Sequence, residues 1–306
     1  MHEFRQQKIR RNLAVRAEVL KAVRAFFAAR DFLEVETPIR IFAPAPEPHI
    51  DAFASQDAWL QTSPELYMKR LLAAGCKRIF QICKTFRAGE RGRLHLPEFT
   101  MLEFYEAGSD YRDAMALTRD LIRFVCRQVT GEKHLDYQGA RIEIFSPWQQ
   151  ITVEEAFARH AGKEMPEALA DGTFDEIISA DIEPGIERSR PAFLFDYPAE
   201  KGALARLRPD RPELAERFEA YIGGLEICNG FTELTDPEEQ RLRFETEQNR
   251  RRKKGLPIYP LPESFLEALS SMPPSAGNAL GMDRLVMLFA GADAIDQVTA
   301  FVPEEY

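Results

Sequence analysis

The chain of 306 residues is poor in cysteine and histidine and lacks a long apolar run. Its four cysteines are scattered without a C-x-x-C pair, which argues against a zinc ribbon and favours a reducing cytoplasm. The five scattered histidines do not predict a histidine-based metal site. No apolar stretch approaches the roughly 20 residues of a membrane helix, and none directly follows the basic N-terminus. We therefore expect neither a membrane span nor a signal peptide.

Positive charge is also in short supply. The chain has 40 lysines and arginines against 49 aspartates and glutamates, a formal net charge of −9. Proteins that bind nucleic acid usually have a basic surplus or a basic face, so the overall charge does not favour an RNA partner. A basic protein partner or a cationic small substrate fits this balance better. The chain also lacks a G-x-x-x-x-G-K-[ST] loop, which excludes a P-loop protein.

The predicted helices and strands alternate in a way that indicates one mixed domain. Hydrophobic periodicity and capping residues predict helices over residues 13–30, 64–74, 110–129, 237–255 and 263–270, with a last helix beginning near 283. Strands are predicted at 32–39, where Pro38 stops the strand or marks a sheet edge, and at 59–62, 78–86, 100–105, 192–197 and 204–207. Two more surround the Gly223–Gly224 turn within 218–231.

Strands joined by hairpins predict an antiparallel sheet with helices packed on it, an α+β fold. We assign residues 1–306 to a single domain. Residues 131–190 are rich in proline, glycine and acidic side chains, and they predict a connecting or insertion region beside the sheet. Short helices are predicted within it at 153–160 and 174–180, but its sequence indicates no function.

The stretch from Arg78 to Tyr105 predicts two strands joined by a charged loop. Arg87 lies where the first strand ends, so a rigid strand would hold its guanidinium group. A guanidinium held in this way suits bidentate binding of a phosphate or carboxylate. Taken alone, the stretch fits a solvated hairpin tip equally well, and the other strand ends decide between these interpretations.

Two further strand ends have conspicuous polar residues. Ser63 and Glu65 lie at a strand-to-helix corner, where Glu65 could also stabilise the helix dipole. Glu226, Asn229 and Glu233 follow the Gly-Gly turn. These positions indicate a site that could accept a cation.

Glu219 and Glu226 flank the same turn, so antiparallel pairing would bring their carboxylates close together. Two near carboxylates repel unless a cation lies between them, and magnesium prefers such oxygen ligands together with substrate phosphates. The alternative is that Glu219 and Glu233 are surface residues at a sheet edge. Arg284, preceded by Gly277 and Gly281, could complete a polyphosphate site with Arg87.

Three segments in order resemble the motifs of class II aminoacyl-tRNA synthetases. FLEVETPI resembles motif 1, the dimer-interface strand; FRAGERGRLHLPEFTMLEFY resembles motif 2; and GNALGMDRLVML resembles motif 3. Lysyl-tRNA synthetases have segments similar in sequence to TSPELYMKRLL and GGLEICNGFTEL. The chain leaves no room for an N-terminal anticodon-binding domain, so it resembles the stand-alone paralogues of the elongation factor P–(R)-β-lysine ligase type.

This resemblance implies roles for individual residues. Arg87 and Arg284 would be catalytic, holding the α-phosphate with the substrate carboxylate and the γ-phosphate, respectively. The amino acid would contact Ser63, Pro64, Glu65, Tyr105, Asn229 and Glu233. ATP would contact Arg87, Gly89, Glu90, His95, Phe99, Glu226, Ile227, Gly281 and Arg284, and Mg²⁺ would lie on Glu219 and Glu226.

Motif 2 departs from the family pattern at two positions. The family usually has a glutamate at the position of Gly89, and we expect Glu90, one place later, to take its role. Leu96 cannot make a polar side-chain contact, so adenine recognition there would rely on backbone groups.

The resemblance implies a cytoplasmic, homodimeric, ATP-dependent ligase. It would activate lysine or (R)-β-lysine as an adenylate and transfer it to a lysine of elongation factor P, and the sequence does not separate the two amino acids. A tRNA partner is disfavoured by the charge. The alternatives are a minimal enzyme that charges tRNA and a non-catalytic binding paralogue.

Overall fold

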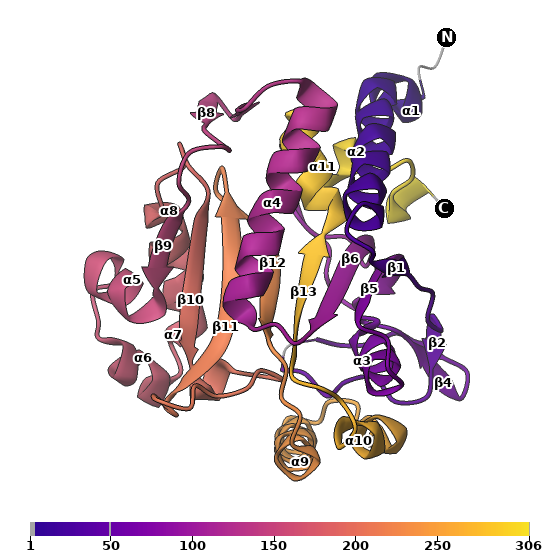
Figure 1. The fold of residues 1–306 in the computed structure, drawn as a ribbon, viewed down its shortest axis with the longest axis vertical. Coiled ribbons are helices and arrows are strands. Elements are labelled where there is room, and N and C mark those ends of the chain that lie inside the picture. Colours follow the sequence, from indigo (N-terminus) through magenta and orange to yellow (C-terminus); the bar gives the residue numbers. More distant parts are fainter. Residues whose placement is uncertain (1–3, 49, 306) are drawn as a thin grey trace.

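A computed structural model describes residues 4–48 and 50–305. Its centre is an eight-stranded sheet (Figure 1). In spatial order the strands are β1 (Leu33–Glu34), β5 (Arg78–Phe86), β6 (Glu98–Ala107), β13 (Ser275–Gly281), β12 (Leu225–Thr232), β11 (Leu214–Ile222), β10 (Ala192–Pro198) and β9 (Gln149–Thr152). The central pairings are antiparallel, as predicted, whereas both edge pairings, β1 with β5 and β9 with β10, are parallel.

The central strands separate an apolar face from a polar one. Side chains alternate between the two faces of a strand. In β6, Leu102 and Phe104 are buried in the main hydrophobic core, whereas Glu103 and Tyr105 line a cavity on the other face. The neighbouring strand β13 places Leu280 in the core and has Gly277 on the cavity side. One period-two pattern therefore builds both the core and the site.

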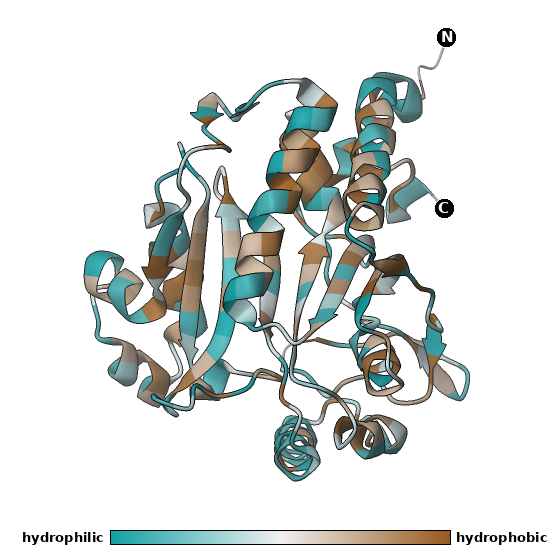
Figure 2. Cartoon of the chain, viewed as in Figure 1, coloured by the Kyte–Doolittle hydropathy of each residue, from teal (hydrophilic) through white to brown (hydrophobic). Residues whose placement is uncertain are grey.

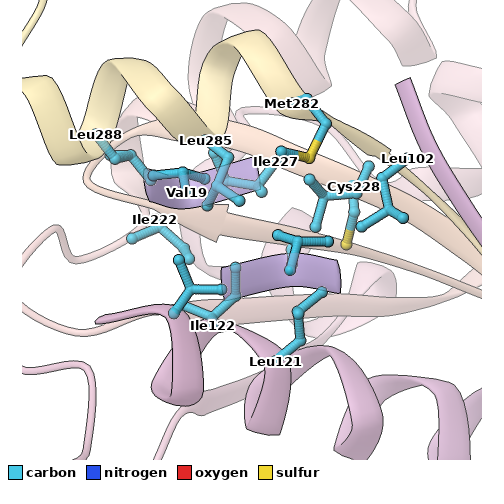
Figure 3. Packing of buried hydrophobic residues seen from close by; sticks show 14 of the residues in the cluster. Val19, Leu102, Leu121, Ile122, Ile222, Ile227, Cys228, Met282, Leu285 and Leu288 are labelled. Atoms are coloured by element: carbon cyan, nitrogen blue, oxygen red, sulfur yellow. The ribbon is translucent and has the colours of Figure 1, made fainter. Parts of the chain in front are cut away.

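Three helices form the core with the sheet: α2 (Arg10–Ala28), α4 (Tyr111–Thr130) and α11 (Met282–Ala290). Figure 3 shows Val19 of α2, Leu121 of α4 and Leu285 of α11 gathered in this cluster. The fully buried Phe27 ring stacks on Phe80 of β5 at a centroid distance of 4.7 Å. Burial of such side chains stabilises the fold by roughly 1.5–3 kcal/mol each.

Helix α4 has clear signals at both ends. Asp110 accepts hydrogen bonds from the backbone N–H groups of Arg112 and Asp113, and the Asp113 side chain accepts one from the Asp110 N–H, which completes a capping box. Gly131 ends the helix at φ +75°, a left-handed conformation that glycine adopts without strain. Midway along the helix, the Thr118 hydroxyl accepts a 2.7 Å hydrogen bond from the amide of Asn278 in β13.

Residues 149–186 form a layer against the β10 side of the sheet, where β9 adds an edge strand (Figure 1). Their apolar side chains form a second core with Leu194 of β10 and Tyr221 of β11. Besides β9, the elements of this layer are α5 (Val153–His160), α6 (Met165–Asp171), α7 (Phe174–Ile177), a π-helix at Ile178–Ile182 and α8 (Glu183–Gly185). The hairpin of β7 (Leu135–Tyr137) and β8 (Ala140–Ile142) precedes this layer and belongs to the main core, where β7 contacts α11.

A third core lies below the sheet in Figure 1, among α3 (Glu65–Ala73), α9 (Pro237–Lys253) and α10 (Glu263–Leu269). Figure 2 shows α9 as mostly hydrophilic, and the buried Phe244 ties it to this core. The smaller elements are α1 (Arg5–Lys8), β2 (Arg40–Ile41), β3 (Ala54–Ser55), β4 (Ala58–Leu60) and 3-10 turns at Ala199–Lys201, Ile295–Gln297 and Pro303–Glu305. No helix among the described residues is long and apolar enough to cross a membrane.

Two strand predictions are wrong in extent. The strand expected over 32–39 is reduced to Leu33–Glu34, because its pairing with β5 ends well before Pro38. Residues 204–207 form isolated bridges rather than a strand, with Ala205 opposite Glu233 and Leu207 opposite Ala215. The hairpin over 78–105 and the turn at Gly223–Gly224 are confirmed.

Candidate active site

A cavity of about 260 Å³ opens on the polar face of β6, β12 and β13 and extends to the start of α11. It gathers most of the residues that the sequence singled out. These are Ser63, Glu65, Arg87, Glu90, His95, Phe99, Tyr105, Glu226, Ile227, Asn229, Glu233, Gly281 and Arg284. Residues far apart in the chain thus meet around one space large enough for a small ligand.

Three predicted residues do not line the cavity. Pro64 is buried at the cap of α3, and the helix begins one residue later than predicted, at Glu65. Gly89 is exposed in the loop after β5, where its φ of +80° suits glycine. Glu219 lies behind the cavity on β11 and is buried, as is Glu233, so neither is a surface residue of a sheet edge.

One end of the cavity is rich in arginine. Arg284 of α11 donates hydrogen bonds to the backbone oxygen of Glu226 at 2.9 Å and to its carboxylate at 3.1 Å. Its other terminal nitrogen donates to Nε2 of His95 at 2.6 Å. Burial and the charge of Arg284 lower the pKa of His95. The imidazole is therefore neutral near pH 7 and adds no positive charge to this end.

Arg87 also lines the cavity, and little negative charge compensates its guanidinium. Its guanidinium lies over the Phe99 ring at 5.2 Å from the centroid and 3.8 Å from Glu90. Its Nε is buried and donates to no partner among the described residues. A buried guanidinium N–H without an acceptor is costly. This atom therefore points to an anionic ligand, as the strand-end position of Arg87 predicted.

The opposite end is rich in carboxylates held around one ammonium. Lys69 of α3 is buried and forms ion pairs with both Glu65 and Glu233. Among the described residues, no donor makes a well-directed hydrogen bond to either oxygen of Glu233, although the Lys69 Nζ lies close to one of them. Burial, ahead of the opposing effect of Lys69, raises the pKa of Glu233 to about 8. This carboxylate can still accept hydrogen bonds from a ligand.

Glu103 completes this acidic end. It accepts hydrogen bonds from the Ser63 hydroxyl at 2.6 Å and from the Tyr105 hydroxyl at 2.7 Å. Burial, followed by the nearby Glu65, raises its pKa to about 8. The hydroxyls of Ser63 and Tyr105, both expected to contact the amino acid, thus position a carboxylate as well.

Space at this end depends on Gly277. It pairs with Tyr105 on one side and with Phe231 on the other. A Cβ atom at this position would collide with the Tyr105 ring and lie 2.6 Å from Oε1 of Glu233. Only glycine leaves the acidic end open.

Sequence reasoning missed Glu103, Lys69 and Glu47. Glu103 is two residues before Tyr105, so strand alternation places both on one face and could have identified it. Lys69 follows Glu65 by one helical turn, a spacing at which ion pairs form. Glu47 lines the cavity from an irregular proline-rich loop, and burial followed by Glu65 raises its pKa to about 7. No periodic signal marked Glu47.

The proposed magnesium ligands are occupied by protein donors. Glu219 accepts hydrogen bonds of 2.6 Å each from Tyr197, Tyr221 and Arg217. Glu226 pairs with Arg284. Burial raises the pKa of Glu219, and the charge of Glu226 adds to that rise, so the two carboxylates do interact. Residues 4–48 and 50–305 contain no cluster of three or more acidic, histidine or cysteine side chains suited to a metal.

The comparison with known proteins agrees with this geometry. Over residues 1–305 the chain matches the family of class II tRNA synthetases (D, K and N). The chain belongs to this family. It is also 40% identical over 308 residues, covering 95% of both chains, to an elongation factor P–(R)-β-lysine ligase of Vibrio atlanticus. The class II synthetase fold and the resemblance predicted from the three motifs are confirmed, and the predicted ligase activity agrees with the name of this relative.

Ligands with ammonium groups should bind this synthetase more tightly as the pH rises from about 6.5 to about 8.5. Binding requires ionised Glu103 and Glu233, whose pKa values of about 8 leave them largely protonated at the lower pH. Because their folded-state pKa lies above the ordinary 4.5, the stability they give the free protein is lost as the pH rises through about 8. Ligand affinity should instead gain roughly 25-fold for each of the two carboxylates that must lose its proton.

Calorimetry with L-lysine at both pH values measures this change, and buffers of different ionisation enthalpy count the protons released. Norleucine, which lacks the side-chain ammonium, is the control ligand. A lysine affinity that is independent of pH, with no proton release, would contradict the protonation of these carboxylates.

Proposed function

We propose that this class II synthetase is an ATP-dependent ligase that activates lysine or (R)-β-lysine and transfers it to a lysine of elongation factor P. The observation that supports it best is the polarity of the cavity. An unsatisfied guanidinium N–H of Arg87 lies toward one end, and an under-bonded carboxylate of Glu233 lies at the other. An amino acid with a carboxylate and a distant ammonium satisfies both.

The acidic end sets the substrate class. Glu233 and the Tyr105 hydroxyl would receive the side-chain ammonium, and Glu65 with Glu103 would receive the amino group nearer the carboxylate. Lys69 neutralises only part of the acidic end. A dication therefore fits better than a monocation, since buried charges are stable only when they are paired.

The basic end suits ATP as the second substrate. Arg87 and Arg284 would hold the phosphates, and Phe99, whose ring also lies against the Arg87 guanidinium, would stack against the base. The carboxylate oxygen of the amino acid attacks the α-phosphorus, and the bond to pyrophosphate breaks. Arg87 and Arg284 would act by aligning the reacting atoms and by stabilising the charge on the phosphates. Magnesium would neutralise phosphate charge, and of its two expected ligands only Glu226 lines the cavity, whereas Glu219 is engaged by three protein donors.

In the transfer step, the amine of the acceptor lysine attacks the acyl carbon of the adenylate. An amide bond forms, the acyl–phosphate bond breaks, and AMP leaves with the electron pair. The proton of the attacking amine must be lost. The choice of elongation factor P as acceptor, and of (R)-β-lysine as the preferred donor, is supported by the name of the Vibrio atlanticus relative.

The direct test is incubation of the enzyme with ATP, Mg²⁺, (R)-β-lysine and elongation factor P, followed by intact-mass spectrometry of the factor. The factor should gain the mass of one β-lysyl group. Arg87→Ala should abolish this gain and the amino-acid-dependent exchange of pyrophosphate, because the unsatisfied guanidinium is removed.

The outcomes separate the alternatives. An unchanged mass of the factor, with pyrophosphate exchange intact and a charged tRNA product, would assign the enzyme to tRNA. No exchange with lysine or β-lysine would identify a binding protein instead. Exchange near the wild-type rate in Arg87→Ala would contradict the placement of the phosphate site.

Glu233→Gln tests the acidic end. The variant keeps the shape of the side chain but loses the charge that faces the substrate ammonium. KM for the amino acid should rise roughly 10- to 100-fold, the equivalent of about 1.5–3 kcal/mol for a hydrogen bond to a charged group. KM for ATP should change little. Glu245→Gln, at an exposed position of α9, is the matched control. An unchanged KM for the amino acid would refute the role of Glu233.

We also propose that the synthetase works as a cytoplasmic homodimer joined through motif 1. Leu33, Ile39 and Phe42 are 58%, 45% and 61% exposed, respectively, an unusual apolar group on a short edge segment. The free state of the four thiols agrees with a reducing compartment.

Light scattering should give the mass of two chains for the wild type and of one chain for Ile39→Arg. Phe301→Arg, 61% exposed elsewhere, should remain dimeric. A monomeric wild type would exclude the dimer.

A further inference from the structure

The end of α9 is an unneutralised basic surface on an acidic protein. Arg252, Lys253 and Lys254 follow one another and are exposed, although the net charge of the chain is −9. Arg252 donates to the side-chain oxygen of Asn249 at 2.5 Å. Within the described part of the chain, no acidic side chain pairs with any of the three basic residues. Many other arginines of this protein, such as Arg208 and Arg241, do have carboxylate partners.

Exposed apolar residues continue this surface. Leu256 and Ile258 are 38% and 41% exposed, and they directly follow the basic residues in the chain. We call residues 252–258 the basic rim. Basic residues at a helix end also stabilise the helix dipole. That effect accounts for Arg252 and Lys253 in the last turn and for Lys254 at the C-cap, but it does not explain the apolar residues after Gly255.

The basic rim is tied to a segment that lines the active-site cavity. The buried Arg251 donates to the backbone oxygen of Pro257 at 2.7 Å and to that of Ile50 at 3.2 Å, and it pairs with Asp51. Ile50 itself lines the cavity.

A second contact extends this connection to the catalytic arginine. The backbone oxygen of Asp51 accepts a 2.7 Å hydrogen bond from the N–H of Ala88, the residue after Arg87. The rim is therefore held by the same two segments that form one wall of the cavity.

We propose that the basic rim is the docking surface for the acceptor protein, which presents an acidic face with an apolar contact beside its acceptor lysine. This inference rests on the proposed function. The acceptor amine must enter the cavity to reach the acyl group, so the surrounding surface of the acceptor must cover the mouth. Opposite charges there steer the encounter and fix its orientation more than they add affinity.

Charge reversal of the rim tests the proposal. In the double variant Lys253→Glu/Lys254→Glu, KM for elongation factor P should rise roughly tenfold at low salt, and the difference should shrink above ~0.5 M salt because screening shortens the reach of the charges. Pyrophosphate exchange with β-lysine should keep its wild-type rate, because neither side chain contacts the cavity. Normal exchange also shows that the variant is folded.

The matched control is Arg127→Glu/Lys133→Glu. These residues are exposed at and just beyond the last turn of α4, at the opposite end of the molecule from α9 in Figure 1. The control makes the same change in net charge and places one glutamate at a helix end in the same way. It should leave KM for the factor unchanged.

An equal rise in KM for both double variants would mean that net charge alone is responsible and would overturn the docking site. An unchanged KM in the rim variant would do the same. If the rim variant lost tRNA binding while KM for the factor stayed constant, the rim would belong to a nucleic acid. Absence of transfer by the wild type would count against the proposed function itself and remove the basis of this inference.

Discussion

The structure depends on how it keeps several carboxylates buried beside a single ammonium. Glu65, Glu103 and Glu233 lie at the acidic end of the cavity. Among the described residues, Lys69 is the only lysine or arginine that forms an ion pair with Glu65 or Glu233, and Glu103 has only hydroxyl donors. Moving an unpaired carboxylate out of water raises the free energy of its ionised form. The pKa values of Glu103 and Glu233 are raised for this reason. The free protein lowers the cost by binding protons. A ligand with two ammonium groups would replace those protons, so selectivity for a dication follows from desolvation.

This charge arrangement requires a particular backbone. Three neighbouring strands must present polar side chains to one face while their alternate residues build the core with α2, α4 and α11. Gly277 must have no side chain, because Tyr105 and Glu233 occupy the space that a Cβ would need. The helix α3 must begin at the cavity so that Glu65 and Lys69, one turn apart, both reach it. The core is therefore also the part that fixes the site.

Much of this could be predicted because it is encoded locally. The start of α5 follows from a capping box at Thr152, and the turn of the β11–β12 hairpin follows from two glycines with positive φ. The site residues were predicted from their positions at strand ends and from the sequences of the three motifs. The parallel pairing of β1 and the existence of β9 were not predicted, because the partners of edge strands are set by tertiary packing. Glu47 lies in a loop with no periodicity, and Lys69 has the appearance of an ordinary solvated residue until the burial of α3 is known.

The net charge of the chain gives an incomplete picture of its partners. A charge of −9 favours basic molecules, and the acidic end of the cavity agrees with a cationic substrate. Electrostatic interactions at a wet surface are screened within about 10 Å, so a protein partner responds to the nearest charges rather than to the total. On the proposed docking surface those charges are the basic side chains of the basic rim. An acceptor lysine with acidic neighbours fits both charge patterns. The acidic end of the cavity attracts its ammonium, while the basic rim attracts its acidic neighbours, which stay outside. The acidic interior and the basic rim therefore select the same kind of acceptor.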